Sequence, residues 1–339
     1  MSAEDPDALL ARARDAGIRP IAVPTPFLVG RVNCYLIEDD PLTLVDTGPN
    51  SGKSLDELER ALRGLGHGVQ DLGLIVITHQ HMDHLGLLEI LARRSGAEVA
   101  ALDLLAPYLQ NFSASATADD DYSMDMMRRH GVPAELVTAL GAVGAAFRAF
   151  GSSGQVTMAL QDGGELRLRD RTLTVLHRPG HSPTDTVFWD AGRKLLLAGD
   201  HLLAHISSNP LLSRPLTPGA GSERPHALQT YIASLRATRE LPATLVLGGH
   251  GPPIDDHVAL IDERLRMHER RAGKVLGLLA DGPLTAYELA TRMWGNVAVT
   301  QAYLTISEVL GHLDLLIADG RARENAAADV TSFEATQVP

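Results

Sequence analysis

The feature that most constrains the fold is a six-residue segment with four potential metal ligands, His79-Gln80-His81-Met82-Asp83-His84. It follows an apolar, β-branched run at residues 72–78, which predicts a buried strand. In a loop at a strand end, residues i and i+2 point the same way, so His79 and His81 can hold one ion together. Asp83 and His84, at the start of the next predicted helix, can face a second ion. Neutral imidazoles bind zinc or iron well and a carboxylate adds charge neutralisation, so the segment predicts a metal centre.

Three further candidate ligands lie at the ends of later predicted strands: His181, Asp200 and His250. Each is next to a glycine, as in Gly180-His181 and Gly199-Asp200. Glycine lets the backbone bend sharply and approach a site closely. We therefore expect all seven ligands to converge at one edge of the sheets, where two metals would share Asp200 and a water.

The order of these motifs, HxHxDH followed by GHS, GD and GHG, resembles the metallo-β-lactamase-fold hydrolase superfamily. The resemblance covers about residues 18–255 and implies an α/β fold, an αββα sandwich with the metals at one edge. The implied ligands of the first metal are His79, His81 and His181. Those of the second are Asp83, His84 and His250, and Asp200 is the implied bridge. The expected cofactors are two divalent ions, zinc first, with iron or manganese as alternatives. Asp46, in Asp46-Thr47-Gly48, is implied to support the metal loop without binding a metal.

The predicted strands and helices agree with that fold. Strands are predicted in two groups, at residues 19–23, 33–38, 42–45, 72–78 and 98–101, and at residues 165–168, 171–177, 186–189, 194–198 and 244–247. Apolar spacing predicts helices at residues 54–65, 85–94 and 226–239. Two successive β-then-α sets indicate sheets packed together with helices outside.

A mostly helical insertion at residues 102–161 interrupts this pattern. It holds three of the six phenylalanines and four of the eight methionines. Flexible methionines and rigid aromatic rings suit an apolar cover over a substrate, so the insertion is a candidate lid. The alternative is that these side chains only pack the insertion onto the sandwich, as apolar residues at helical spacing usually do.

The composition changes near residue 255, after every candidate ligand. From there we predict helices at residues 257–280, 285–294 and 299–318, with no strand of consequence. Residues 256–323 resemble, more weakly, the small winged-helix domain of some β-lactamase-like proteins, certain endoribonucleases among them, and residues 318–321 would open a wing. No Lys or Arg occurs from Trp294 to Gly320, although groove-reading helices use these side chains. A packing or dimerisation module is therefore expected, with a homo-oligomer as one assembly. Residues 324–339 are expected to form a flexible tail.

The overall composition excludes several classes of protein. Thirty basic and 42 acidic residues give a net charge of −12, which argues against a nucleic-acid partner because Lys and Arg supply most of that affinity. The longest nearly unbroken apolar run, residues 137–147, is far shorter than the about 20 residues that span a bilayer. The acidic start of the chain is unlike a secretory signal, and the single cysteine, Cys34, agrees with a reducing compartment. We expect a cytoplasmic protein with a small-molecule substrate and no membrane partner.

Two motifs near the first predicted helix have plainer explanations than catalysis. Residues 48–54 nearly match a phosphate-binding loop, but only three residues separate its glycines where the motif has four. Ser51 or Ser54 is expected to cap a helix instead. Asp46-Thr47-Gly48 is also found in aspartic proteases, whose chemistry needs a second carboxylate from a second copy, and the chain has no second copy. Cys34, in the middle of a predicted strand, is expected to be a small buried hydrophobe.

The expected chemistry follows from the metals, because a bound metal lowers the pKa of water to about 7. The resemblance thus implies a metal-dependent hydrolase in which a metal-bound hydroxide attacks a carbonyl or phosphorus centre, with Asp83 as the catalytic residue that orients the water or accepts its proton. His201 and His205 are the candidates for a general acid.

The substrate is less constrained, since family members hydrolyse β-lactams, thioesters, lactones and phosphodiesters. A small acyl substrate, a thioester, lactone or related ester, is the first expectation because the chain is acidic and the insertion apolar. An endoribonuclease or phosphodiesterase is the alternative. A DNA-binding regulator is a third hypothesis, which would leave the metal ligands without a purpose.

Overall fold

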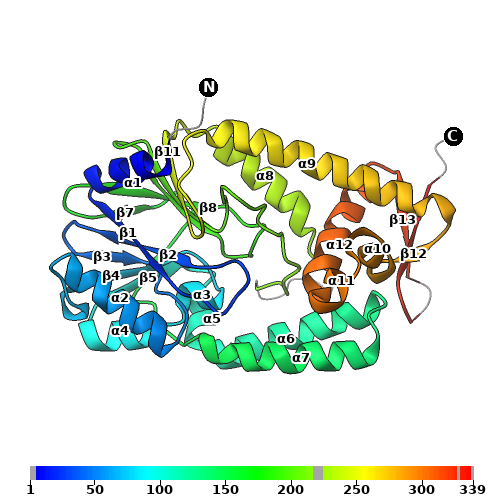
Figure 1. The fold of residues 1–339 in the computed structure, drawn as a ribbon, viewed down its shortest axis with the longest axis horizontal. Helices are drawn as coiled ribbons and strands as arrows, with labels where there is room; N and C mark the ends of the chain where they lie inside the picture. Colours follow the sequence, from blue (N-terminus) through cyan, green and yellow to red (C-terminus); the bar gives the residue numbers. More distant parts are fainter. Residues whose placement is uncertain (1–4, 217–223, 327–328, 337–339) are drawn as a thin grey trace.

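Two sheets stacked face to face form the left-hand part of the computed structural model in Figure 1, which describes residues 5–216, 224–326 and 329–336. The first sheet has the order β1 (Ile18–Val23), β2 (Val32–Ile37), β3 (Thr43–Val45), β4 (Leu74–Ile77), β5 (Glu98–Leu102), β6 (Met158–Leu160). The second has the order β11 (Leu245–Gly248), β10 (Leu195–Gly199), β9 (Thr186–Asp190), β8 (Thr172–His177), β7 (Glu165–Arg167). Both sheets mix parallel and antiparallel pairs. The expected αββα sandwich is therefore confirmed, with β6 as a strand that the sequence analysis missed.

Alternating side chains explain why the sheets stack. In β4, Leu74 and Val76 lie in the core between the sheets, whereas Ile75 and Ile77 lie in the core under the helices of the first sheet. In β10, Leu195 lies in the shared core in the same way. Because successive side chains of a strand point to opposite faces, a strand covered on both sides is apolar throughout.

Helices cover both outer faces of the sandwich (Figure 1). The first sheet carries α2 (Gly52–Gly64), η1 (Val69–Asp71), α3 (Met82–Leu85) and α4 (Leu88–Ser95), and the second carries α8 (Ala227–Arg239) and α9 (His257–Leu278). The helix α1 (Pro6–Asp15) packs at β1. Ser51 caps α2, since its Oγ accepts a hydrogen bond from the N–H of Ser54 at 3.1 Å. Among the described residues, no helix is both long and apolar enough to cross a membrane.

The insertion is a helical hairpin that reaches from the sandwich to the C-terminal region (Figure 1). It comprises α5 (Ala106–Gln110), α6 (Phe112–Arg129), α7 (Ala134–Phe147) and η2 (Arg148–Phe150). At one end, Phe147 and Phe150 pack against Phe27, with ring centroids 5.3 and 6.1 Å away. At the other end, Met127 is buried among the C-terminal helices. These contacts agree with the packing interpretation, and a lid function stays a prediction.

The C-terminal region contains the predicted helices and, in addition, a small sheet. The helices are α9, η3 (Leu279–Asp281), α10 (Ala286–Trp294), α11 (Val297–Thr300) and α12 (Ala302–Ala318). The antiparallel sheet has the order β12 (Leu284–Thr285), β14 (Ser332–Ala335), β13 (Ala322–Asn325). The domain boundaries and the winged-helix assignment stay predictions.

The expectation of no strand in this region is wrong at residues 284–285, 322–325 and 332–335, and the described part of the expected flexible tail contains the end of β13 and all of β14. The strand β14 pairs with both β12 and β13. Phe333 at its centre is fully buried in the C-terminal core, and this single apolar anchor is too weak a pattern to predict a strand. Residues 327–328 and 337–339 of the expected tail lie outside the described residues.

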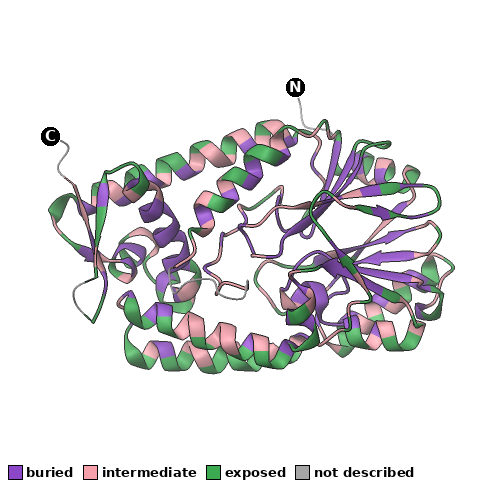
Figure 2. Ribbon diagram, turned by 180° about the vertical axis from the view of Figure 1, so that it is seen from behind, coloured by how far each residue is buried: buried purple, intermediate pink, exposed green. Residues whose placement is uncertain are grey.

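The helix α12 is buried around most of its circumference (Figure 2). It contacts α6, α8, α9 and α10. Polar residues on it are enclosed too, including Ser307, Glu308 and Asp314. The helix thus lies at the junction of the insertion, the second sheet's helices and the C-terminal region.

Candidate metal centre

The seven predicted ligands come together where the carboxyl ends of strands from both sheets meet. His79 and His81 follow β4, and the short helix α3 carries Asp83 and His84. His181, Asp200 and His250 follow β8, β10 and β11. Their ligand atoms form three groups, each within 4.8 Å: His79, His81 and His181; His79, His84 and Asp200; Asp83, His84 and His250.

The first group is a triangle of imidazole nitrogens. Nδ1 of His81 lies 3.0 Å from Nε2 of His79 and 3.0 Å from Nε2 of His181. Nitrogens bound to one tetrahedral zinc ion at 2.0–2.1 Å are about 3.3 Å apart. The spacing therefore suits a single cation held by three histidines.

Asp200 lies between this triangle and the second group. Its Oδ1 is 3.4 Å from Nε2 of His84, and its Oδ2 is 3.4 Å from Nε2 of His250 and 3.7 Å from Nε2 of His181. Oδ2 of Asp83 is 3.3 Å from the same His250 nitrogen. One carboxylate thus faces both groups, as a bridging ligand would.

Hydrogen bonds at the opposite ring nitrogen orient four of the five histidines. The pairs are His79 Nδ1 with Thr78 Oγ1 (3.0 Å), His84 Nδ1 with Asp46 Oδ2 (2.7 Å), His181 Nδ1 with the Asn209 carbonyl (3.0 Å) and His250 Nδ1 with the Arg31 carbonyl (2.7 Å). In the neutral imidazole, donation from Nδ1 leaves the lone pair of Nε2 directed at the cluster. His81 differs, because its Nδ1 faces the other histidines.

Asp46 organises the loop that carries the first ligands. It adopts a positive φ of 60° at the end of β3, and its Oδ1 accepts a hydrogen bond from the N–H of Thr78 at 2.9 Å. Its Oδ2 accepts from the Thr78 hydroxyl at 2.9 Å and from His84. This buried carboxylate lies in the supporting position that the family resemblance implied.

The donor set also fits a cation because three of its buried atoms, although close to one another, make no hydrogen bond within the described part of the chain. Nε2 of His84, Oδ1 of Asp200 and Nε2 of His250 are buried and accept or donate no hydrogen bond among the described residues. A buried polar atom without a partner costs about 1–3 kcal/mol. A cation placed among these atoms would satisfy all of them.

The pKa values of the clustered side chains also favour a bound cation. Burial, and then the neighbouring His181, lowers the pKa of His81 to about 3, so that this ring is neutral at pH 7. Burial also lowers the pKa of His250, but Asp200 and Asp83 outweigh burial and raise it to about 9. Burial would raise the pKa of Asp83, yet His84 and His250 keep it below its ordinary value. The carboxylates are therefore ionised and attract positive charge into the site.

The two candidate general acids differ in accessibility. His201 is fully buried, its Nε2 lies 2.8 Å from the Thr238 hydroxyl, and burial lowers its pKa to about 3, so it cannot donate a proton near pH 7. His205 is exposed. Its ring lies against Gly251, where an added Cβ would come within 2.3 Å of His205 Nδ1. Of the two, only His205 is both accessible and close to the loop of His250.

The sequence analysis missed residues of β2 that join the two sheets beside His250. The Asn33 amide donates to the carbonyls of Gly248 and Gly251 at 3.0 and 2.9 Å, and the Tyr35 hydroxyl donates to Gly248 at 2.6 Å. A polar Asn33 in an apolar strand was the one available signal. Cys34, between them, is buried as predicted.

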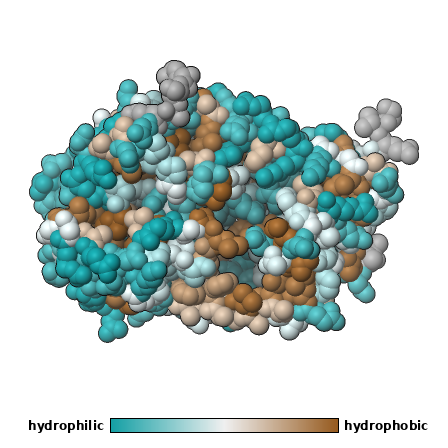
Figure 3. Space-filling model, viewed as in Figure 1, coloured by the Kyte–Doolittle hydropathy of each residue, from teal (hydrophilic) through white to brown (hydrophobic). Residues whose placement is uncertain are grey.

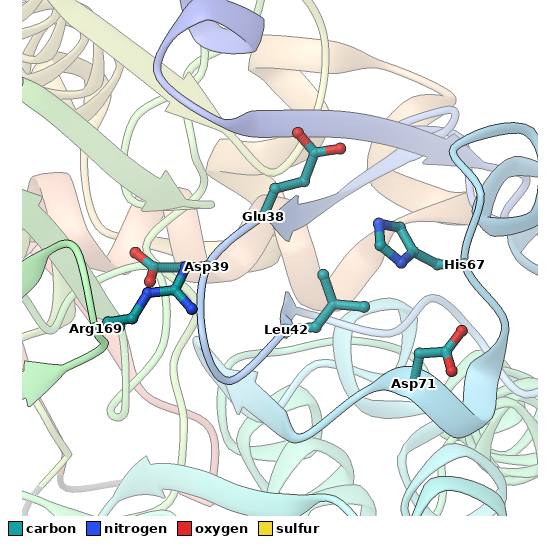
Figure 4. Close-up of a pocket in the computed structure, with 6 residues that line it drawn as sticks. All are labelled: Glu38, Asp39, Leu42, His67, Asp71 and Arg169. Atoms are coloured by element: carbon teal, nitrogen blue, oxygen red, sulfur yellow. The ribbon is translucent and has the colours of Figure 1, made fainter.

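A surface pocket elsewhere is unrelated to this centre (Figure 4). Its lining residues are Glu38, Asp39, Leu42, His67, Asp71 and Arg169. Leu42 precedes β3 and Glu38 follows the antiparallel β2, so the pocket lies at the edge of the first sheet opposite to His79. The Asp39 carboxylate forms a salt bridge with Arg171, with 3.1 Å between Oδ2 and Nε.

Comparisons with known proteins agree with the geometry. The family model described as Metallo-beta-lactamase superfamily matches residues 28–250. The probable metallo-hydrolase YqjP of Bacillus subtilis is 33% identical over 299 residues, covering 88% of this chain and 92% of that protein. The Atrochrysone carboxyl ACP thioesterase of Aspergillus terreus is 24% identical over 305 residues, covering 85% and 75%. The crystal structure of a metallo-beta-lactamase family protein from Thermus thermophilus has a TM-score of 0.80 and 28% identity, covering 94% of this chain and 99% of that one.

Proposed function

Because the chain belongs to the metallo-beta-lactamase superfamily and is a metallo-hydrolase, we propose that it is a dinuclear enzyme that hydrolyses a carrier-bound acyl thioester. One observation supports two metals: two groups of three residues lie on either side of the Asp200 carboxylate, which faces both groups. In this proposal His79, His81 and His181 hold the first divalent ion, Asp83, His84 and His250 hold the second, and Asp200 contacts both. Zinc is the first choice because five of the seven ligands are histidines.

Two metals would supply Lewis acidity for the substrate carbonyl and a nucleophile from water near neutral pH. The chain's own residues would orient these parts. Asp83 is ionised and its Oδ2 points at the shared region near His250. We assign it the role of holding the water and accepting its proton. His205, exposed beside Gly251, is the residue that we assign to protonate the leaving group.

The thioester assignment rests on a relative and on apolar side chains at the surface. The Aspergillus terreus relative, whose name describes a carrier-protein thioesterase, aligns over most of this chain. Figure 3 shows a hollow near the middle of the face seen in Figure 1, with apolar side chains along its rim. Large apolar side chains are exposed in three segments: Leu28 (91%) between β1 and β2, Ile206 (38%) shortly after Asp200, and Leu304 (37%) in the first turn of α12. An apolar acyl chain is the kind of group that such a rim would receive.

The same structure argues against a nucleic-acid substrate read by the C-terminal region. The helix expected as the recognition helix, α12, is enclosed by protein on most sides. It also carries no Lys or Arg, the residues that contact phosphates and base edges. These two properties of α12 argue against the endoribonuclease alternative and against a DNA-binding regulator.

A substrate panel on metal-analysed protein tests the proposal. Protein purified without chelators is expected to contain about two transition-metal ions per chain and to lose activity after chelation. It should hydrolyse acyl-CoA or acyl-pantetheine thioesters faster than lactones, β-lactams or RNA. No metal uptake on reconstitution would refute the metal centre, whereas bound metal with preference for RNA or a β-lactam would refute only the thioester assignment.

A further inference from the structure

We propose that the C-terminal helix α12 helps to position the ligand His181 through Asn209, so that the C-terminal region supports the first metal site without supplying a ligand to it. This inference rests on the metal-binding part of the proposed function and is independent of the substrate. Asn209 would be a positioning residue, because it would act on the metal only through His181.

The connection consists of two hydrogen bonds in series. Nδ1 of His181 donates to the backbone carbonyl of Asn209 at 3.0 Å. The side-chain amide of the same Asn209 donates through Nδ2 to the backbone carbonyl of Leu304 at 3.1 Å, in the first turn of α12. The carbonyl that orients the ligand therefore belongs to a residue whose side chain is fixed to the C-terminal region.

No other hydrogen bond within the described part of the chain holds that side chain. The other amide atom, Oδ1 of Asn209, is buried and has no hydrogen-bond partner there. Loss of the Nδ2 bond would leave the side chain without its polar anchor. The backbone carbonyl of Asn209 would then depend on its chain neighbours for its position.

Those neighbours run between the metal centre and α12. On one side, the Ser208 hydroxyl donates to the backbone carbonyl of the bridging residue Asp200. On the other side, Leu212 is buried in the C-terminal core, and its carbonyl accepts a hydrogen bond from the Tyr303 hydroxyl. The segment from Asp200 to Leu212 thus connects two ligands of the centre to one helix.

The effect on metal binding should be measurable because only three histidines and the shared Asp200 face the first ion in this proposal. Partners that orient a ligating histidine typically change metal affinity by 10–100-fold when they are removed. His181 has one such partner, the Asn209 carbonyl. A shift of this carbonyl would turn the imidazole and misdirect Nε2, which now lies 3.0 Å from His81.

The test compares Asn209→Ala with Gln229→Ala in the full-length protein. Both residues are half-buried and both donate a side-chain amide hydrogen bond to a backbone carbonyl of α12, since Gln229 Nε2 lies 3.0 Å from the Asp314 carbonyl. Only Asn209 touches a candidate ligand. Stepwise zinc and cobalt affinities of metal-free protein are measured with a competing chelator, and the absorption spectrum of the cobalt form is recorded. The melting temperature of the metal-free protein shows how much each substitution destabilises the fold itself.

In Asn209→Ala one of the two affinities should fall about 10-fold or more, with a changed cobalt spectrum, while Gln229→Ala should match the wild type. Equal affinities in the two variants would overturn the proposal. If Asn209→Ala does not fold, Tyr303→Phe, which removes the neighbouring hydrogen bond to Leu212, should weaken the same affinity by a smaller factor, and an unchanged affinity there would overturn it. Wild-type protein that takes up no metal would instead refute the metal centre itself.

Discussion

Nδ1 of His84 lies 2.7 Å from Oδ2 of Asp46, and both side chains are buried. This contact decides which nitrogen of His84 faces Asp200, because donation from Nδ1 leaves Nε2 for the cluster. Asp46 also receives hydrogen bonds from the backbone and the hydroxyl of Thr78, the residue just before His79. One carboxylate therefore orients a histidine in α3 and holds the loop that starts at His79.

Asp46→Asn should weaken the binding of one metal by about 10–100-fold. The amide keeps the shape of the carboxylate, but it either loses an acceptor toward Thr78 or turns an N–H toward His84 Nδ1. Stepwise metal affinities of the metal-free protein measure the effect. Asp39→Asn is the matched control, because Asp39 is a buried carboxylate paired with Arg171 at the opposite sheet edge. It should lower stability with both metal affinities unchanged; equal losses of affinity in the two variants would contradict the role of Asp46.

Asp83→Asn should lower turnover by at least about 100-fold, in line with general-base contributions of 10²–10⁴. The substitution removes the charge and the proton acceptor but keeps the shape. Because Asp83 lies outside the triangle of His79, His81 and His181, the first metal should remain bound. Turnover and metal content are measured together.

His79→Ala is the counterpart of that variant. It removes one of three nitrogens that lie within 4.8 Å of one another, so the first metal should be lost along with activity. Near-full activity of Asp83→Asn with both metals bound would require another proton acceptor. Retention of two metals by His79→Ala would show that the triangle is not a metal site.

The sequence identified the side chains that the fold brings together because their signals are local. Asp83 and His84 lie in one short segment with His79, and His181 and His250 each adjoin glycines at strand ends. These patterns can be recognised without knowledge of the fold. The partners that orient these ligands left no such signal. Arg31 and Asn209 act through backbone carbonyls, which any residue possesses, so only the folded structure can identify them.

The fold was predictable where apolar runs were long and was missed where they were short. The strand β4 has four consecutive buried apolar residues, whereas β6 has three residues with one of them exposed. β14 has a single fully buried residue, Phe333. Short strands of this kind form because neighbouring strands and helices bury one side chain, and that tertiary contribution is absent from a local pattern.

Phe333→Ala should therefore lower the free energy of unfolding by about 3–5 kcal/mol, as expected for removal of a buried aromatic ring. Phe333 is fully buried and stacks on His130 with ring centroids 6.0 Å apart. Urea denaturation measures the change. Val330→Ala serves as control, because Val330 lies in the same segment at 38% exposure and should cost less than about 0.5 kcal/mol. If neither substitution changes the free energy of unfolding, the segment would be a flexible tail after all.

A buried histidine pair between α9 and α12 predicts a loss of stability in acid. Nδ1 of His268 lies 3.3 Å from Nε2 of His312. Burial, followed by the neighbouring His312 and Arg271, lowers the pKa of His268 to about 3. The unfolded chain binds a proton near pH 6.5, and the native state does not until about pH 3. The contribution of His268 to stability is thus complete above about pH 6.5 and falls as the pH drops toward 3.

At pH 4.5, about two units below the pKa of His268 in the unfolded chain, protonation stabilises the unfolded state by about 2–3 kcal/mol relative to the native state. We expect the free energy of unfolding of metal-free protein to fall more between pH 7.5 and 4.5 in the wild type than in His268→Gln, by roughly that amount. Glutamine keeps a polar side chain opposite His312 but cannot take up a proton. All other histidines are present in both proteins, so the difference between the two pH dependences isolates His268. Identical pH dependences would mean that His268 has the same pKa in the native and the unfolded state. Water would then reach the contact between α9 and α12.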